Sequence, residues 1–280
     1  MDIRYSTGPE DFKKYTTEEI RREFLVETIF KPDEVIATYS HVDRMVTVGC
    51  MPVKEVVPLD KGIDCWKNFG THYFLERREI GIFNVGDEGK IVADGVTYTM
   101  GYQDCIYIAM GTKKVTFCSE NPTKPAKFYM VSAPAHKSCK TQFISIKDAN
   151  KRPCGSPELA NDRVINQFIH PDVVETCQLC MGMTSLKPGS VWNSMPCHTH
   201  ERRMEIYFYF EIPKDQAVFH IMGQGQETRH IVMHNEQAVI NPSWSIHCGC
   251  GTHNYIFIWA MGGENKEFDD MDHIKIEDMK

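Results

Sequence analysis

Residues 195–210 read MPCHTHERRMEIYFYF, a stretch that joins two closely spaced histidines to an aromatic strand. A β-strand sends residues i and i+2 to the same face, so His198 and His200 can point into one cavity. Glu205 stands at odd spacing from both histidines and cannot share their face along one unbroken strand. The pattern therefore predicts a turn or bend within ERRM, after which Glu205 opens a return strand.

The predicted return strand has two unlike faces. One face carries a carboxylate and two phenols, from Glu205, Tyr207 and Tyr209. The alternate face is apolar and consists of Ile206, Phe208 and Phe210. The first face is typical of a site lining, and the second is typical of packing against another layer of the core.

Short strands dominate the rest of the chain. Gly, Pro, Asn and Asp separate runs such as ATYSHVDRMVTVG, KIVADGVTYTM, KVTFC, AVFHIMG and YIFIWAM. One helix is expected over Thr16 to Val26, because Thr16 and Glu19 have the spacing of a capping box. Many short strands with frequent turns are typical of β-sandwiches and barrels. The sequence predicts an all-β fold with minor helices.

The chain also divides into two similar halves. The polar stretch SIKDANKRPCGSPELAND (145–162) separates them and predicts domains 1–150 and 151–280. THYFLERREIGIFNV in the first half resembles CHTHERRMEIYFYFE in the second. Aligning Glu79 with Glu205 pairs two further positions, His72 with His198 and Phe74 with His200. The first domain is therefore expected to keep the scaffold without a full metal-binding set.

A fourth metal ligand must come from outside the quoted stretch. His247 in NPSWSIHCG is the best candidate, because a turn led by proline just before a histidine places that histidine at a strand junction. His198, His200, Glu205 and His247 would offer three nitrogens and one carboxylate. Such a set suits Zn, Fe, Mn or Ni, and ligand type alone does not choose among them.

Two other groups of residues are candidates for chemistry. Cys177 and Cys180 form a C-x-x-C, which occurs in zinc and redox sites, but no partner motif follows and core thiols are the preferred interpretation. An arginine fork matches a carboxylate. The second half offers four arginines, for each of which a solvated side chain is the preferred interpretation: Arg163, Arg202, Arg203 and Arg229.

Composition limits the class of protein. The 280 residues are 42% hydrophobic and 25% charged, with a net charge of −7, and no basic cluster indicates a nucleic acid or membrane partner. The first residues, MDIRYSTGPEDF, lack a signal-peptide pattern. The 11 cysteines show no disulfide framework and are interpreted as reduced thiols, which favours a cytoplasmic protein.

The order of the four ligands resembles the cupin metal motifs. HTHERRME matches the first motif, and PSWSIH matches the second with Trp244 in place of its glycine. The likeness extends over most of the chain. FLVETIF, YSHVDRM, YFLERRE, APAH, ETCQL, ETRHIVMHNEQAVI, FIWAMGGEN and FDDMDH follow one another in the order seen in the 5-keto-4-deoxyuronate isomerase family, also called 4-deoxy-L-threo-5-hexosulose-uronate ketol-isomerases.

That resemblance implies a fold, a cofactor and a reaction. The family consists of bicupins, with two tandem cupin-type jelly-roll barrels, that form homohexamers and hold one Zn²⁺ per subunit in the C-terminal cupin. The matching ligands here are His198, His200, Glu205 and His247. The family interconverts 5-keto-4-deoxyuronate and 3-deoxy-D-glycero-2,5-hexodiulosonate, small anionic sugars from pectin and similar uronates.

The expected mechanism is proton transfer between adjacent carbons through an enediol. Glu205, a metal-bound hydroxide or a tyrosine such as Tyr207 or Tyr209 are the alternatives for the proton-transferring group, and they remain open. Arg163 and Arg202 are the first candidates for binding the substrate carboxylate. Two other readings of the same ligand set are a cupin dioxygenase and a non-catalytic, pirin-like regulatory or sugar-binding bicupin.

Overall fold

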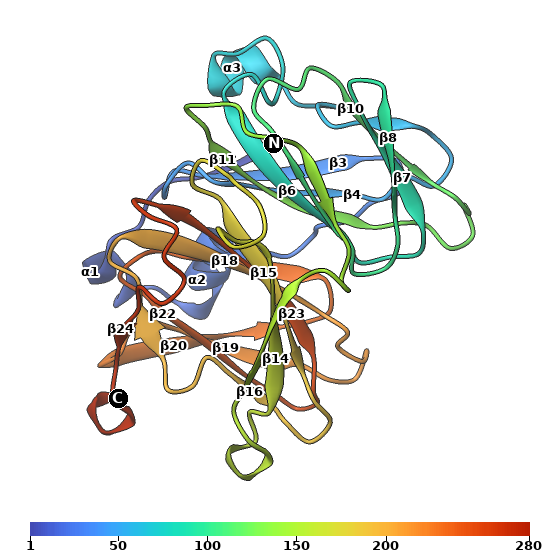
Figure 1. Ribbon diagram of the computed structural model, residues 1–280. Coiled ribbons are helices and arrows are strands. Elements are labelled where there is room, and N and C mark those ends of the chain that lie inside the picture. Colours follow the sequence, from blue (N-terminus) through green and yellow to red (C-terminus); the bar gives the residue numbers. More distant parts are fainter. The chain divides into compact units, whose positions relative to one another are not determined.

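The computed structural model describes all 280 residues, and the chain forms two compact units (Figure 1). The first unit comprises residues 1–3, 28–149 and 168–180, and the second comprises residues 4–27, 150–167 and 181–280. Segment 4–27 therefore lies in the unit of the second half, and segment 168–180 in that of the first. A boundary at residue 150 between separately folding domains stays a prediction.

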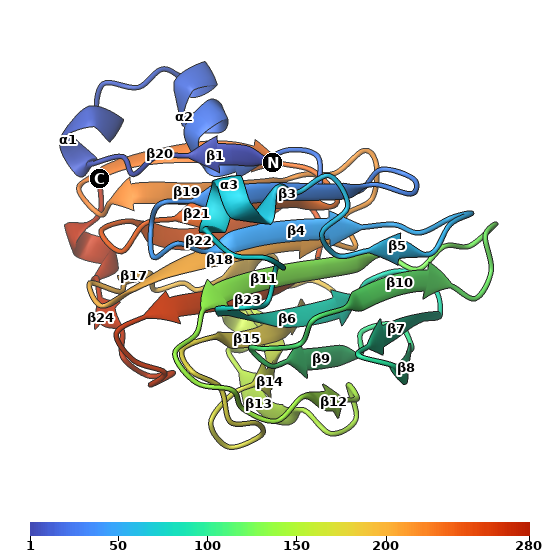
Figure 2. The same ribbon diagram turned by 90° about the horizontal axis from the view of Figure 1, so that it is seen from above.

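The first unit contains two sheets of antiparallel strands. The seven-stranded sheet has the order β1 (Asp2–Arg4), β3 (Val35–Ser40), β4 (Val46–Cys50), β11 (Phe128–Pro134), β6 (Arg78–Asn84), β9 (Cys105–Ile108) and β12 (Gln142–Ile144) (Figure 2). The four-stranded sheet has the order β5 (Val57–Pro58), β10 (Val115–Ser119), β7 (Gly89–Ala93) and β8 (Val96–Met100). A short helix, α3 (Cys65–Phe69), precedes β6.

The second unit repeats this plan. Its seven-stranded sheet has the order β13 (Asn150–Cys154), β14 (Arg163–Ile169), β15 (Cys180–Leu186), β23 (Ile256–Gly263), β18 (Arg203–Phe210), β21 (Gln237–Asn241) and β2 (Leu25–Val26). Its four-stranded sheet has the order β16 (Trp192–Asn193), β22 (Ile246–Gly251), β19 (Val218–Gln224) and β20 (Glu227–Met233). A further pair joins β17 (His198–Thr199) to β24 (Asp272–His273).

The remaining elements are short helices. They are α1 (Pro9–Phe12), α2 (Thr17–Phe24), η1 (Pro157–Leu159) and η2 (Ile276–Asp278). The capping box predicted at Thr16 is present, since Thr16 and Glu19 bond each other's backbone amides. None of the helices has the length and apolar character needed to cross a membrane. The prediction of an all-β fold with minor helices is confirmed.

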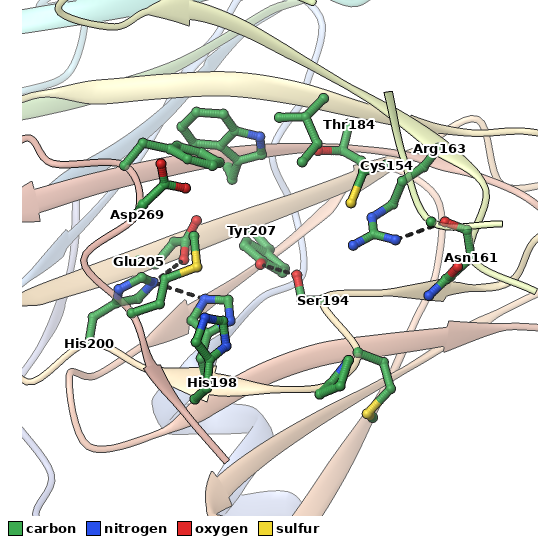
Figure 3. A pocket seen from close by; sticks show the side chains of 18 of the residues that line it. Cys154, Asn161, Arg163, Thr184, Ser194, His198, His200, Glu205, Tyr207 and Asp269 are labelled. Carbon is green, nitrogen blue, oxygen red and sulfur yellow. Dashed lines mark hydrogen bonds and ion pairs between the residues drawn. The ribbon is translucent and has the colours of Figure 1, made fainter. Parts of the chain in front are cut away.

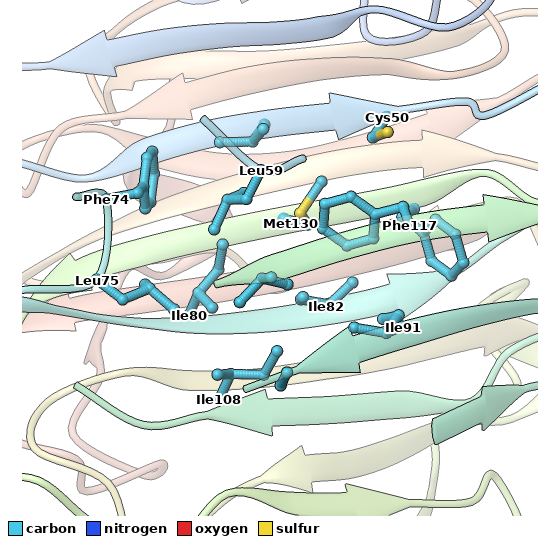
Figure 4. Close-up of a cluster of buried hydrophobic side chains, with 14 of the residues drawn as sticks. Cys50, Leu59, Phe74, Leu75, Ile80, Ile82, Ile91, Ile108, Phe117 and Met130 are labelled. Carbon is cyan, nitrogen blue, oxygen red and sulfur yellow. The ribbon is translucent and has the colours of Figure 1, made fainter. Parts of the chain in front are cut away.

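The space between the two sheets of the first unit is filled by apolar side chains. Ile82 and Met130 of the larger sheet meet Ile91 and Phe117 of the smaller one, and all four are fully buried (Figure 4). Phe74, the residue aligned with His200, also belongs to this cluster. The interior of the first unit is therefore a closed hydrophobic core at this place.

Glu79 points away from that core. Ile80 and Ile82 belong to the apolar cluster, so the alternate residues of β6 face the other side of the sheet. The buried Glu79 carboxylate accepts bonds of 2.7–2.8 Å from the Tyr107 hydroxyl and from the amides of residues 177–179. The alignment of Glu79 with Glu205 is thus wrong in register, because an odd shift moves a side chain to the opposite face.

The N-terminal segment covers the turn that precedes His247. The rings of Phe12 and Phe24 lie 5.3 and 6.4 Å from that of Trp244, and the Trp244 indole N–H donates to the Thr7 carbonyl at 3.1 Å. Trp244 replaces the glycine of the second cupin motif. The large side chain is accommodated because residues of α1 and α2 pack around it.

Candidate metal centre

Three strands of the second unit bring the predicted ligands together. His198 lies in β17, Glu205 in β18 and His247 in β22. The Arg203 amide donates to the His200 carbonyl at 3.0 Å, so the turn predicted within ERRM is present. Because β18 belongs to the seven-stranded sheet and β22 to the four-stranded sheet, both sheets of this unit contribute side chains to the group.

The four side chains form one tight, buried group. The His198 Nε2 atom lies 3.1 Å from the Nε2 atoms of both His200 and His247. The Glu205 Oε2 atom lies 2.8 Å from His247 Nε2 and 3.2 Å from His200 Nε2 (Figure 3 labels the two H-x-H histidines and Glu205). All four residues are at most 7% exposed.

The donor set fits a divalent metal ion. The Nδ1 atoms of His200 and His247 lie 2.8 and 3.2 Å from the carbonyls of Asp270 and Ser245, which fixes the proton on Nδ1 and turns the Nε2 lone pairs inward. Ligands bound to one zinc-like ion at roughly 2.0–2.2 Å stand about 3 Å or more apart. The four ligand atoms here lie within 4.8 Å of one another. Inward lone pairs and a carboxylate repel one another unless a cation lies between them.

The charges of the group also suit a cation. Burial, followed by His247 and His200, lowers the pKa of His198 to about 2, so this imidazole is neutral at pH 7. Burial by itself would raise the pKa of Glu205, but His247 and His200 outweigh it and hold the pKa below its usual range. A neutral imidazole and an ionised carboxylate are the forms that bind metal.

A cavity of about 670 Å³ opens onto this group. His198, His200 and Glu205 line one end, and Arg163 lies at the other (Figure 3). Tyr207 and Ser194 stand between them. Aromatic residues form much of the wall: Phe257, Trp259 and Phe268. The volume and the few placed polar groups are typical of a small-molecule site.

The two tyrosines of the predicted polar face have different surroundings. The Tyr207 hydroxyl lies in the cavity, 2.9 Å from the Ser194 hydroxyl. Burial, and then Glu205, raise the pKa of Tyr207 well above its usual value, so it keeps its proton. Tyr209 does not line the cavity, and its hydroxyl lies 2.8 Å from His220 Nδ1.

Of the four candidate arginines, only Arg163 lines the cavity. Its guanidinium donates to the Asn161 carbonyl at 2.8 Å and has no carboxylate partner. Arg202 forms ion pairs with Asp270 and Asp272 instead. Two others are also engaged elsewhere: Arg203 bonds the Glu267 and Asp270 carbonyls, and Arg229 pairs with Glu227. The structure therefore brings one of the two favoured arginines to the site.

The sequence matches a family model described as the KduI/IolB family over residues 38–276. The chain belongs to the KduI/IolB family. Two curated relatives of this family member are named 4-deoxy-L-threo-5-hexosulose-uronate ketol-isomerase. The one from Pectobacterium carotovorum is 53% identical and the one from Caldicellulosiruptor bescii is 49% identical, each over 100% of both chains. The predictions of this family and of an isomerase-class enzyme are confirmed.

Solved structures show the same fold. An IolB-like protein from Salmonella typhimurium superimposes with a TM-score of 0.70 at 13% identity, over 90% of this chain and 96% of that one. Oxalate decarboxylase from Lactobacillus farciminis gives a TM-score of 0.54 at 10% identity, over 83% and 79%. The predicted fold class, with two cupin-type barrels, is confirmed for this KduI/IolB family member.

Sequence reasoning missed part of the site of this family member. Phe268, Asp269, Met271 and His273 line the cavity, although they come from the chain's C-terminal end. The FDDMDH segment carries three aspartates, a charge opposite to that of the arginines in ERRM. Asp270 and Asp272 both pair with Arg202, whereas Arg203 bonds backbone carbonyls.

The cysteines lie outside the ligand group. Cys177 precedes β15 and its thiol donates to the Lys137 carbonyl, whereas Cys180 is buried at the start of β15. The group that could hold a metal ion, His198, His200, Glu205 and His247, includes no thiol. All 11 cysteines are unpaired by disulfides. Cys180 occupies the core as preferred, whereas Cys177 is only partly buried.

Proposed function

We propose that this protein is a metal-dependent ketol-isomerase that interconverts 5-keto-4-deoxyuronate and 3-deoxy-D-glycero-2,5-hexodiulosonate. The observation that carries the proposal is a buried group of three histidines and one glutamate at one end of a cavity, with an unpaired arginine at the other. A ligand with a carbonyl at one end and a carboxylate at the other matches this polarity. The names of the full-length relatives point to such a sugar acid.

The proposal has further parts that rest on the family resemblance. One Zn²⁺ is held by His198, His200, Glu205 and His247, and the first barrel holds none. The protein acts as a homohexamer in the cytoplasm, in the breakdown of pectin-derived uronates. The domain boundary at residue 150 belongs to the same proposal.

The metal, Arg163 and Tyr207 have separate roles in the proposed reaction. The bound metal supplies Lewis-acid stabilisation of the negative charge that develops on the substrate oxygen. Arg163 binds the substrate carboxylate with two parallel N–H donors and so fixes the distance of the reacting carbons from the ligand group. Tyr207, protonated and 2.9 Å from the Ser194 hydroxyl, donates its proton to the substrate oxygen that becomes negative in the enediolate, and it regains a proton from the neighbouring hydroxyl when the new carbonyl forms.

Glu205 is the candidate tested here as the base that removes the carbon-bound proton. Glu205 contacts His200 and His247 and also lines the cavity, so it can serve as a ligand, as a base or as both. Glu205→Gln is expected to lower both metal content and turnover. A variant that retained metal and full turnover would remove Glu205 from the base role.

The decisive experiment combines metal analysis with an anaerobic assay. Purified protein is expected to contain about one divalent ion per chain. It is expected to convert 5-keto-4-deoxyuronate, prepared from unsaturated galacturonate, without oxygen and without a change in mass. A strict need for oxygen would establish the dioxygenase instead. Bound metal with no turnover of the uronate would establish the pirin-like binding module.

A further inference from the structure

The segment 264–275, called here the C-terminal strap, forms one wall of the cavity. Phe268, Asp269, Met271 and His273 of the strap all line it. The ring of Phe268 packs 5.2 Å from that of Trp259, and β24 pairs with β17 so that His273 lies opposite His198. The strap therefore touches both the aromatic wall and the first metal ligand.

The strap also orients the second ligand. The Asp270 carbonyl lies 2.8 Å from His200 Nδ1 and accepts a bond from the Arg203 guanidinium at 2.7 Å. Arg203 Nη2 lies 3.1 Å from the same His200 nitrogen. Because a carbonyl oxygen can only accept, the contact with Asp270 requires the proton on Nδ1, which leaves Nε2 as the ligand atom. A shift of Asp270 would thus rotate or release the His200 ring.

Arg202 fixes Asp270 in place. Its Nε donates to Asp270 Oδ2 at 3.0 Å and its Nη2 to Asp270 Oδ1 at 2.6 Å, a bidentate fork. Nη2 also lies 2.9 and 3.0 Å from the two carboxylate oxygens of Asp272. A backbone hydrogen bond also connects Arg202 to the strap, since the Glu264 amide donates to the Arg202 carbonyl at 2.9 Å.

These contacts leave Arg202 no role at the substrate. It does not line the cavity, and both ends of its fork are directed at strap carboxylates. We infer that Arg202 is a positioning residue, which holds the C-terminal strap against the metal ligands and thereby sets the orientation of His200 and the shape of the cavity wall. The inference rests on the proposed metal dependence of the site.

The test compares Arg202→Ala and Arg202→Lys with the wild type and with Arg229→Ala. Arg229 is a matched control because it pairs with Glu227 and donates to the Lys13 carbonyl, away from the cavity. Lysine keeps the charge but cannot form the planar fork, so Arg202→Lys serves if the alanine variant fails to fold. Zn²⁺ affinity, measured by competition with a chromogenic chelator, is expected to fall about 10–100-fold in Arg202→Ala and less in Arg202→Lys.

Two further measurements separate positioning from general stability. The visible spectrum of Co²⁺-loaded protein is expected to change in Arg202→Ala, because His200 is no longer held in one orientation. Amide hydrogen exchange of residues 264–275 is expected to quicken in Arg202→Ala and not in Arg229→Ala. The kinetic expectation is a loss in kcat larger than the rise in KM.

Unchanged Zn²⁺ affinity together with unchanged exchange of the strap in Arg202→Ala would overturn the inference. A rise in KM alone, with affinity and spectrum preserved, would also overturn it by placing Arg202 on the substrate. Failure of the wild type to bind Zn²⁺ would count against the proposed function instead. In that case the exchange measurement still decides whether Arg202 holds the strap, since it needs no metal.

Discussion

The two units share one strand order and differ in what lies between their sheets. In the first unit the space is filled by apolar side chains such as Ile82 and Phe117. In the second, the equivalent space holds the four-residue ligand group and a chain of polar contacts, in which His220 bridges the Tyr209 hydroxyl and the Asn241 side chain. The same scaffold thus supports either a dry core or a site, and strand order alone does not determine function.

Both units contain buried polar atoms without a hydrogen-bond partner. A dry core is stabilised by burial, whereas buried polar groups stabilise a fold only when each one is hydrogen-bonded. In the second unit, Asn193 Oδ1 and Asn241 Nδ2 are buried without a hydrogen-bond partner. In the first unit, Thr71 Oγ1 is likewise buried without a hydrogen-bond partner, so this local cost does not distinguish the two units.

The largest expected effect comes from removing a ligand. His247→Ala should abolish stoichiometric metal binding and lower kcat/KM on the order of 10²–10³-fold, because a main source of charge stabilisation is lost. Metal analysis and steady-state kinetics measure both. The control is His72→Ala in the first unit, a histidine outside the four-residue group, which should leave both unchanged. Retention of metal and activity in His247→Ala would remove the distinction between the barrels.

A smaller effect is expected at the far end of the cavity. Arg163→Gln should raise KM about 10–100-fold, since a charged hydrogen bond contributes roughly 1.5–3 kcal/mol. Metal content should not change, because Arg163 contacts none of the four ligands. Arg229→Gln is the control. An unchanged KM in Arg163→Gln would exclude this arginine as the carboxylate site.

The smallest effect is expected from substituting Glu79, the buried glutamate of the first unit, which is compared with Glu205 of the second. Glu79→Gln should lower the free energy of unfolding by about 1–3 kcal/mol, because an amide NH₂ would face donors that now reach a carboxylate. The shift in the urea midpoint measures this, and metal content should stay that of the wild type. A loss of metal without a loss of stability in Glu79→Gln would show that the two glutamates have similar roles after all.

Local patterns in the sequence predicted much of the ligand group. Strand parity alone required a turn between His200 and Glu205, and the turn is present. The proline-led turn before His247 was also predicted, and it is present, with the Ser245 amide donating to the Pro242 carbonyl at 2.9 Å. These features depend on residues close together in the chain, where steric and hydrogen-bonding preferences are visible in the sequence.

Other features depended on distant residues and could not be predicted. Arg202 and Asp270 are 68 residues apart, so no local pattern showed that their charges meet. The sequence alignment placed Glu79 on the wrong face of its strand. A charged residue at the end of a hydrophobic run can face either side of a sheet, and only the pairing with neighbouring strands determines which side it faces. The cover over Trp244 includes Thr7, which lies 237 positions earlier in the chain.

The division of the chain into units has a consequence for its modularity. Strand β2 pairs with β21 of the second unit, while the amides of residues 177–179 complete the setting of Glu79 in the first. A chain cut at residue 150 would yield one fragment without the donors to its buried carboxylate and another without an edge strand and the cover of Trp244. Each compact unit therefore includes a segment from the other half of the chain, 168–180 in the first unit and 4–27 in the second.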